Sequence, residues 1–177
     1  WWQALSLLHP PGERQRHPWF GRTLALTSLI TITIVSGGFV AGLKAGKLYN
    51  TFPMMGDYWL PPGAMALQPA WRNFFDNHAL VQFDHRVLAL TTFALIVAYW
   101  FGARKTELMP RLKKGINALL HTAVLQVVLG ISTLLLVVPL ALAAAHQAVG
   151  MLLFSVALYV CHTSFGYAPV GAASSRD

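Results

Sequence analysis

The sequence predicts an all-α integral membrane protein built as a four-transmembrane-helix bundle. Of its 177 residues, 55% are hydrophobic and only 11% are charged, whereas soluble domains carry about 25% charged residues. Four stretches with no charge, or with charge only at one end, are long enough to cross a hydrocarbon core, which needs about 20 apolar residues. These stretches are residues 23–43, 83–103, 115–138 and 141–162.

The spans divide the chain into three parts. Residues 1–22 combine an apolar run, WWQALSLL, with a basic segment, and we expect the tail of a preceding helix and an inner loop. Residues 23–162 form the predicted transmembrane domain, with an outer loop at 44–82, and residues 163–177 form an inner C-terminal tail. A signal peptide fits the first run poorly, because no basic segment precedes it. We therefore expect one part of a longer membrane protein.

The basic residues are distributed unequally along the chain. Nine of the 13 Lys and Arg residues lie before residue 23, in the loop 104–114 or in the tail, and the loop 44–82 holds three. The positive-inside rule then places both termini on the cytoplasmic or matrix side. The net charge of +7 is thus explained by the orientation of the chain across the membrane and does not indicate a nucleic-acid partner. A single cysteine, Cys161, excludes an internal disulfide and a cysteine-based metal site.

The long outer loop is rich in aromatic residues and prolines. The prolines exclude one continuous helix. The aromatic side chains could form an interfacial belt on the lipid headgroups or a lid over a site near the outer surface. They are Tyr49, Phe52, Tyr58, Trp59, Trp71, Phe74 and Phe75.

Two of the seven histidines are predicted to lie at the same depth in the bundle. An ionisable residue inside a span costs about 2.5–3.5 kcal/mol, so each requires a reason. His85 and His146 enter their spans from the outer side, whereas His121 enters its span from the inner side. His162 lies at the inner end of the last span, where an interfacial position is expected. Two imidazoles at matched depth on different helices can bind one metal from opposite sides.

Small residues near both histidines leave room for a flat ligand. Residues 143–145 are alanines that precede His146, and Ala89 follows His85 by one turn. A haem is one interpretation of this pattern, and a pair of buried, hydrogen-bonded histidines is the other. Zinc is less favoured, because no third or fourth ligand of a suitable type is near. A row of glycines in the first span permits close helix contact: Gly38, Gly42 and Gly46.

Polar residues flank His85 along the second span. Arg86 could pair with a haem propionate, because a planar carboxylate suits the guanidinium group. It could also pair with Asp84 or with a lipid phosphate. Gln82 lies one turn before His85 on the same face, but an amide does not titrate and cannot act as an acid or base. Gln126 is a further polar residue expected inside the bundle.

Four motifs, in order, resemble the haem A synthase family in its bacterial and mitochondrial form. They are GGFVAGLKAGKLYNTFPMMGDYWLP, RNFFDNHALVQFDHR, LGIST and AAAHQAVG. The resemblance implies one half, the second, of an eight-helix protein made of two similar halves. It implies that His85 and His146 are axial ligands of a haem b cofactor. Gln82 stands where the family's first half has a glutamate, so no catalytic residue is expected in this half.

The resemblance also implies a reaction and a set of partners. The family oxidises the C8 methyl group of haem O to a formyl group, giving haem A for cytochrome oxidase. This half would pass electrons or support the N-terminal half, which would hold the substrate, and two copies could also associate. The location would be a bacterial or mitochondrial inner membrane, and the sequence identifies no electron donor. The alternatives are a cytochrome b-type electron-transfer subunit without synthase activity, and a transporter or assembly factor whose histidines bind nothing.

Overall fold

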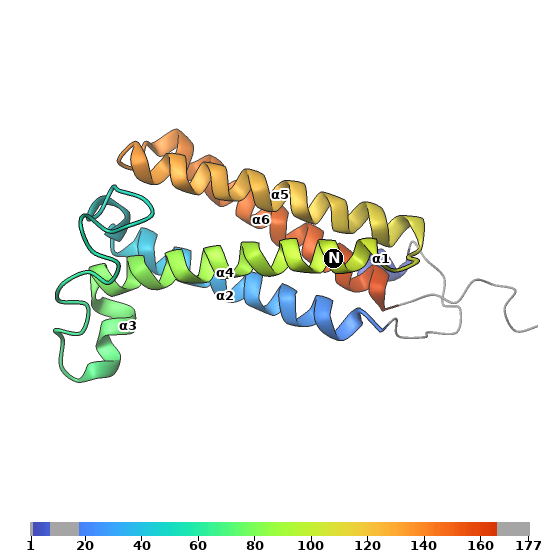
Figure 1. The fold of residues 1–177 in the computed structure, drawn as a ribbon, viewed down its shortest axis with the longest axis horizontal. Coiled ribbons are helices and arrows are strands. Elements are labelled where there is room, and N and C mark those ends of the chain that lie inside the picture. Colours follow the sequence, from blue (N-terminus) through green and yellow to red (C-terminus); the bar gives the residue numbers. More distant parts are fainter. Residues whose placement is uncertain (1, 8–17, 166–177) are drawn as a thin grey trace, which may run out of the picture.

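Four long helices form the body of the molecule (Figure 1). The structure, a computed structural model, describes residues 2–7 and 18–165. All four helices are long and apolar enough to cross a membrane, and the described residues contain no strand. The predicted fold class is therefore confirmed. The helices are α2 (Phe20–Gly42), α4 (His78–Arg104), α5 (Pro110–Leu135) and α6 (Leu140–Ser164).

The ends of these helices differ from the predicted spans where local chemistry intervenes. Helix α4 begins five residues early, because the Asn77 side chain accepts hydrogen bonds from the N–H groups of Ala79 and Leu80 and so caps the helix. Helix α5 ends at Leu135 and not at 138, because Val137 and Val138 have φ values of 60° and 59°. This left-handed conformation is uncommon for β-branched residues.

The helices pack as a ring in the order α2, α4, α5, α6. Helix α2 contacts α4 and α6, and α5 contacts the same two helices. The long loop and the α5–α6 turn lie at one end, which we call the loop end (Figure 1). The α4–α5 connection lies at the opposite end. The loop and the turn were predicted to share one side of the membrane, and they share one end of the bundle. Which compartment each end faces stays a prediction.

The hydrophobic core is concentrated away from the loop end. Within it, the Thr23 hydroxyl lies 2.7 Å from the Tyr99 hydroxyl. His162 is also buried here, with Nε2 3.3 Å from Ser6 Oγ of the short helix α1 (Trp2–Leu7). His162 lies in the last turn of α6, as predicted, but its side chain is buried against α1 and does not extend to the surface; its position relative to the membrane interface stays a prediction. The core residues are Trp19, Leu26, Ile30, Ile96, Tyr99, Ala103, Leu112, Ile116, Leu119, Ala123, Leu153, Ala157 and Val160.

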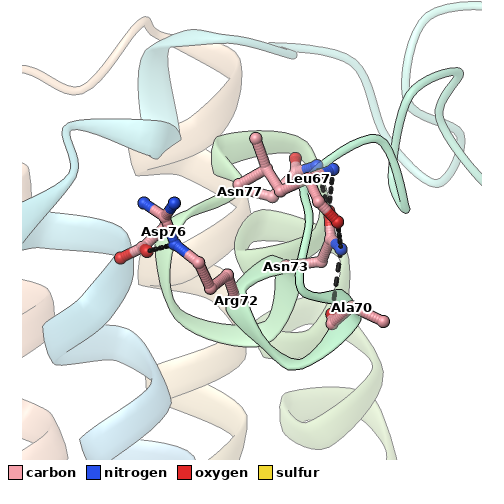
Figure 2. A network of polar contacts seen from close by, with 6 residues as sticks. All are labelled: Leu67, Ala70, Arg72, Asn73, Asp76 and Asn77. Carbon is pink, nitrogen blue, oxygen red and sulfur yellow. Dashed lines mark hydrogen bonds and ion pairs between the residues drawn. The ribbon is translucent and has the colours of Figure 1, made fainter.

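The long loop contains only short helical turns, as the prolines predict. They are η1 (Ala45–Lys47), η2 (Ala70–Arg72) and α3 (Asn73–Asp76). Figure 2 shows the Asn73 side chain, which accepts from the Leu67 N–H, donates to the Leu67 carbonyl and accepts from the Asn77 side chain. It thereby links the loop before η2 to the start of α4. Most of the large aromatic side chains of this region are exposed, Trp59 by 70% and Trp71 by 62%, whereas Tyr49 and Phe52 are half-buried. Such exposure suits an interfacial belt. The segment of the loop that lies near a site is residues 49–54, which are described below.

Candidate cofactor site between two histidines

A single cavity of about 680 Å³ occupies the loop-end half of the bundle. All four long helices and η1 line it, and its walls are mainly apolar. Its volume lies within the range of about 300–1,000 Å³ that is typical of small-molecule and cofactor sites. The core residues Ile30, Ile96 and Leu153 also line it, so the packed half of the bundle closes the cavity at one end.

His85 and His146 both line this cavity. His85 lies seven residues after the first residue of α4, and His146 lies six residues after the first residue of α6. At about 1.5 Å per residue, these positions correspond to depths of about 10 Å and about 9 Å from the loop end. The predicted match in depth is confirmed. His121 is exposed on α5 and does not line the cavity.

A hydroxyl group lies between His85 and a backbone carbonyl. Ser36 Oγ is 2.7 Å from the Thr33 carbonyl oxygen, which can only accept, and 2.8 Å from His85 Nδ1. With the hydroxyl hydrogen directed to this carbonyl, Oγ accepts from Nδ1–H of the neutral imidazole. In that arrangement Nε2 of His85 keeps a free lone pair, as a metal ligand requires.

His146 lacks such a hydroxyl. Its Nδ1 is buried near the Gln126 carbonyl oxygen without a hydrogen bond of regular geometry. Nε2 is thus the ring nitrogen of His146 that remains for a ligand in the cavity. Both imidazoles line the same cavity, so one group could contact both.

Each imidazole lies against a glycine of the neighbouring helix. A Cβ atom at Gly37 would lie 3.0 Å from Cε1 of His85, and one at Gly130 would lie 2.9 Å from Cε1 of His146. Both distances are shorter than ordinary van der Waals contact, so a side chain at either position would displace the ring. The sequence analysis did not single out either glycine.

The predicted glycine row, Gly38, Gly42 and Gly46, makes fewer contacts with other segments than expected. A Cβ atom at Gly38 or Gly42 would meet nothing within 4 Å, and only Gly46 lies near another segment, with Val138 at 3.3 Å. The prediction that this row permits close helix contact is therefore wrong for Gly38 and Gly42 within this chain. The small residues Ala89, Ala143, Ala144 and Gly150 do line the cavity, as the sequence suggested.

Arg86 and Gln82 tie the outer loop to α4 beside His85. Arg86 Nη1 donates to the carbonyl oxygens of Thr51, at 2.8 Å, and Met54, at 3.2 Å. Arg86 Nη2 donates to the Tyr49 carbonyl at 2.8 Å, which also accepts from Gln82 Nε2 at 2.9 Å. Both side chains line the cavity. They therefore hold residues 49–54 at its mouth, where the sequence analysis allowed for a lid.

Two lysines and two glutamine side chains also line the cavity. Lys44 and Lys47 of the η1 region line it, and neither forms an ion pair among the described residues. The Oε1 atoms of Gln82 and Gln126 are buried without a hydrogen-bond partner. A buried acceptor left unpaired costs about 1–3 kcal/mol, so these atoms indicate donors in the cavity that the protein does not supply itself.

Comparison with known proteins places the chain in a family. A family model described as cytochrome oxidase assembly protein (COX15-CtaA) matches residues 1–158. The chain belongs to this family. It is 46% identical over 165 residues to a heme A synthase of Nitrosospira multiformis, and this match covers 91% of the chain and 46% of the relative.

The mitochondrial relatives give the same result. Identity is 41% over 169 residues to heme A synthase COX15 of Arabidopsis thaliana, with 92% of the chain and 37% of the relative covered. It is 42% over 166 residues to heme A synthase COX15 of Homo sapiens, with 90% and 40% covered. The chain thus spans less than half the length of these curated relatives. No solved structure matches it. The resemblance noted from the motifs is confirmed.

The geometry limits the chemistry that this cavity can perform. Two imidazole rings line a mainly apolar space from opposite helices, and three cationic side chains line it as well. Gln82 and Gln126 cannot exchange protons at ordinary pH. The site therefore suits binding of a flat metal complex that carries acidic groups, and it contains no evident acid or base beside the histidines.

Proposed function

We propose that this chain is the second four-helix half of a haem A synthase and binds haem b between His85 and His146. The observation that carries the proposal is the placement of two imidazoles, from α4 and α6, in one mainly apolar cavity. The names of the relatives support the reaction class. We also propose a bacterial or mitochondrial inner membrane as the location, with both termini on the cytoplasmic or matrix side.

The residues present fit a haem. Gly37 and Gly130 leave space for each ring beside the facing helix, where a Cβ atom would push the ring away. The Ser36 hydroxyl orients His85 so that Nε2 can ligate iron. A haem with two histidine ligands has no open iron position, and it supplies single-electron transfer when bound. The apolar walls of the cavity would exclude water from it.

Lys44 and Lys47 are the best partners for the haem propionates. Both line the cavity at the loop end and have no carboxylate partner among the described residues. The two terminal nitrogens of Arg86 already donate to loop carbonyls, and Nε is its only nitrogen without a partner. Arg86 therefore acts mainly by holding residues 49–54 over the site, and its direct bond to a propionate stays a prediction.

The N-terminal half of the proposed enzyme would supply what this cavity lacks. Oxidation of a methyl group to a formyl group requires a bound substrate haem O and a titratable group near it. One histidine pair holds one haem, and Gln82 offers no carboxylate. We therefore propose that the N-terminal half of the same enzyme holds the substrate, and that this half supports it by electron transfer.

The test is to express residues 1–177 with haem b and haem O available, and then to analyse the extracted haem by chromatography. We expect stoichiometric haem b, a low-spin absorption spectrum and no haem A. Haem A should form only when the N-terminal half is co-expressed. Haem A formation by this chain alone would contradict the division of roles and would suggest that two copies associate. If the complete enzyme contained only haem b and made no haem A, the cytochrome b-type alternative would replace the proposal.

A further inference from the structure

A second cavity lies at the end of the bundle opposite to the histidines. It has a volume of about 400 Å³, and its lining residues come from the end of α4, the α4–α5 connection and the start of α5. No part of the proposed function uses it. Its lining residues are Trp100, Ala103, Arg104, Thr106, Leu108, Lys113, Ile116 and Asn117.

Internal contacts orient the polar side chains of this second cavity. The guanidinium carbon of Arg104 lies 4.6 Å from the centre of the Trp100 ring, which restricts the arginine by a cation–π contact. Trp100 Nε1 donates to Asn117 Oδ1 at 2.7 Å. Since the indole can only donate, the amide orientation of Asn117 is fixed. The amide oxygen is engaged, and Nδ2 remains as a donor.

The groups available in the cavity are therefore mainly hydrogen-bond donors. Arg104 and Lys113 bring two positive charges, and Asn117 Nδ2 brings a neutral donor. No carboxylate lines the cavity, since Glu107 of the connection lies outside its lining. Guanidinium and ammonium groups together with an amide N–H suit the oxygens of a phosphate group. A neutral ligand would leave two charges without a partner.

We propose that this second cavity binds the phosphate of an anionic phospholipid headgroup. The site lies where two membrane-spanning helices end, so a lipid phosphate is at the right level. Its apolar residues Ala103, Leu108 and Ile116 are suited to the glycerol and upper acyl region. Basic pockets between helices at the cytoplasmic or matrix face bind such headgroups in other membrane proteins. The predicted topology places this end on that face. The proposal does not depend on haem binding.

The test is native mass spectrometry of the full chain, released from nanodiscs that contain phosphatidylglycerol and phosphatidylcholine. We expect retained phosphatidylglycerol, and at least tenfold less of it in the double variant Arg104→Gln, Lys113→Gln. The matched control is Lys105→Gln, Lys114→Gln, which loses the same charge at the same end but does not alter the lining. Retention in the control should stay within twofold of the parent chain.

A third variant guards against misfolding. Asn117→Asp keeps an acceptor for Trp100 and adds a negative charge in the cavity, so it should also lose the lipid while thermal unfolding stays unchanged. Equal losses in the two double variants, or no retained phosphatidylglycerol in the parent, would overturn the proposal. Added inorganic phosphate separates the two sources of this chemistry. Displacement of the lipid at millimolar phosphate would overturn the proposal of a lipid ligand and assign the site to free phosphate.

Discussion

In both helix pairs that carry a histidine, a glycine of one helix lies against the imidazole ring of the other, but the hydrogen bonding of the two rings differs. In the pair α2 and α4, Gly37 lies against the ring of His85, and in the pair α5 and α6, Gly130 lies against the ring of His146. The residue before the first glycine is Ser36, whose Oγ lies within hydrogen-bond distance of Nδ1 of His85. The residue before the second is Leu129, and His146 Nδ1 has no regular hydrogen bond.

This difference separates two requirements of a ligand site. Space for a flat ring comes from a glycine on the facing helix, and both pairs meet this requirement. Orientation of the lone pair comes from a hydrogen-bond partner for the other nitrogen, and only the first pair has a side chain for it. We therefore expect the two imidazoles to be equally necessary but unequally restrained.

The largest expected effect is the loss of either imidazole. His85→Ala and His146→Ala should each abolish the low-spin haem spectrum, because one axial ligand alone does not give a six-coordinate bis-histidine iron. Absorption spectra of the purified variants measure this. The control is His121→Ala, which changes an exposed side chain outside the cavity and should leave the spectrum unchanged. A low-spin spectrum retained by both single variants would rule out the ligand assignment.

The next effect tests the contact between each of the two glycines and its histidine ring. Gly37→Ala and Gly130→Ala place a methyl group about 3 Å from a histidine ring. Overpacking of this kind costs about 1–3 kcal/mol, which corresponds to roughly 5- to 150-fold weaker haem binding. Titration of the apoprotein with haem measures the affinity. Gly42→Ala is the matched control, because its methyl group meets nothing within 4 Å and Gly42 does not line the cavity. Equal affinities for all three variants would show that the glycines are not needed for the rings.

The third effect sharpens the difference between the pairs. Ser36→Ala removes the acceptor of Nδ1–H, so the two neutral tautomers of His85 should become more equally populated. Nitrogen NMR of the apoprotein detects this without haem. A typical hydrogen bond contributes about 0.5–1.5 kcal/mol, so haem affinity should fall roughly 2- to 12-fold. Leu129→Ser should act in the opposite direction by offering His146 a hydroxyl. An unchanged tautomer ratio in Ser36→Ala would contradict the hydrogen-bond chain.

The smallest effect concerns the lysines at the mouth of the cavity. Lys44→Gln and Lys47→Gln should each weaken haem binding by only a few fold, because exposed ion pairs contribute about 0.2–1 kcal/mol. The loss should shrink as salt is added. Haem dimethyl ester, which lacks free carboxylates, serves as the control ligand and should bind all variants alike. A similar loss with the ester would mean that the lysines act on the fold and not on propionates.

The sequence predicted the fold and the depth of the histidines because both depend on hydropathy and length. Four apolar stretches define four spans, and alternating crossings place His85 and His146 at the same end. The missed helix ends depend on single local contacts. Asn77 caps α4 from within a polar loop, and the turn at Val137 interrupts an apolar run whose composition favours continuation.

The remaining parts of the site depend on how each helix is rotated about its axis. Spacing drew attention to Gly38 and Gly42, whereas the glycine against His85 is the adjacent Gly37. Ser36 is one of several hydroxyl residues in the first span, and nothing in its neighbourhood along the chain indicates that it, and not another of them, faces an imidazole 49 residues away. The lysines of the η1 region were read only as charges that set topology.

The α5–α6 turn has a strained backbone conformation and also forms part of the cavity wall. Val137 and Val138 both have positive φ, a conformation that costs roughly 1–2 kcal/mol for each L-residue with a side chain. Glycine would relieve this cost, yet Val138 lines the cavity and contacts the Gly46 position. A variant with glycine at 138 would therefore be expected to withstand more heat while its cavity lost part of one wall. Thermal stability and ligand binding would then change in opposite directions in the same variant.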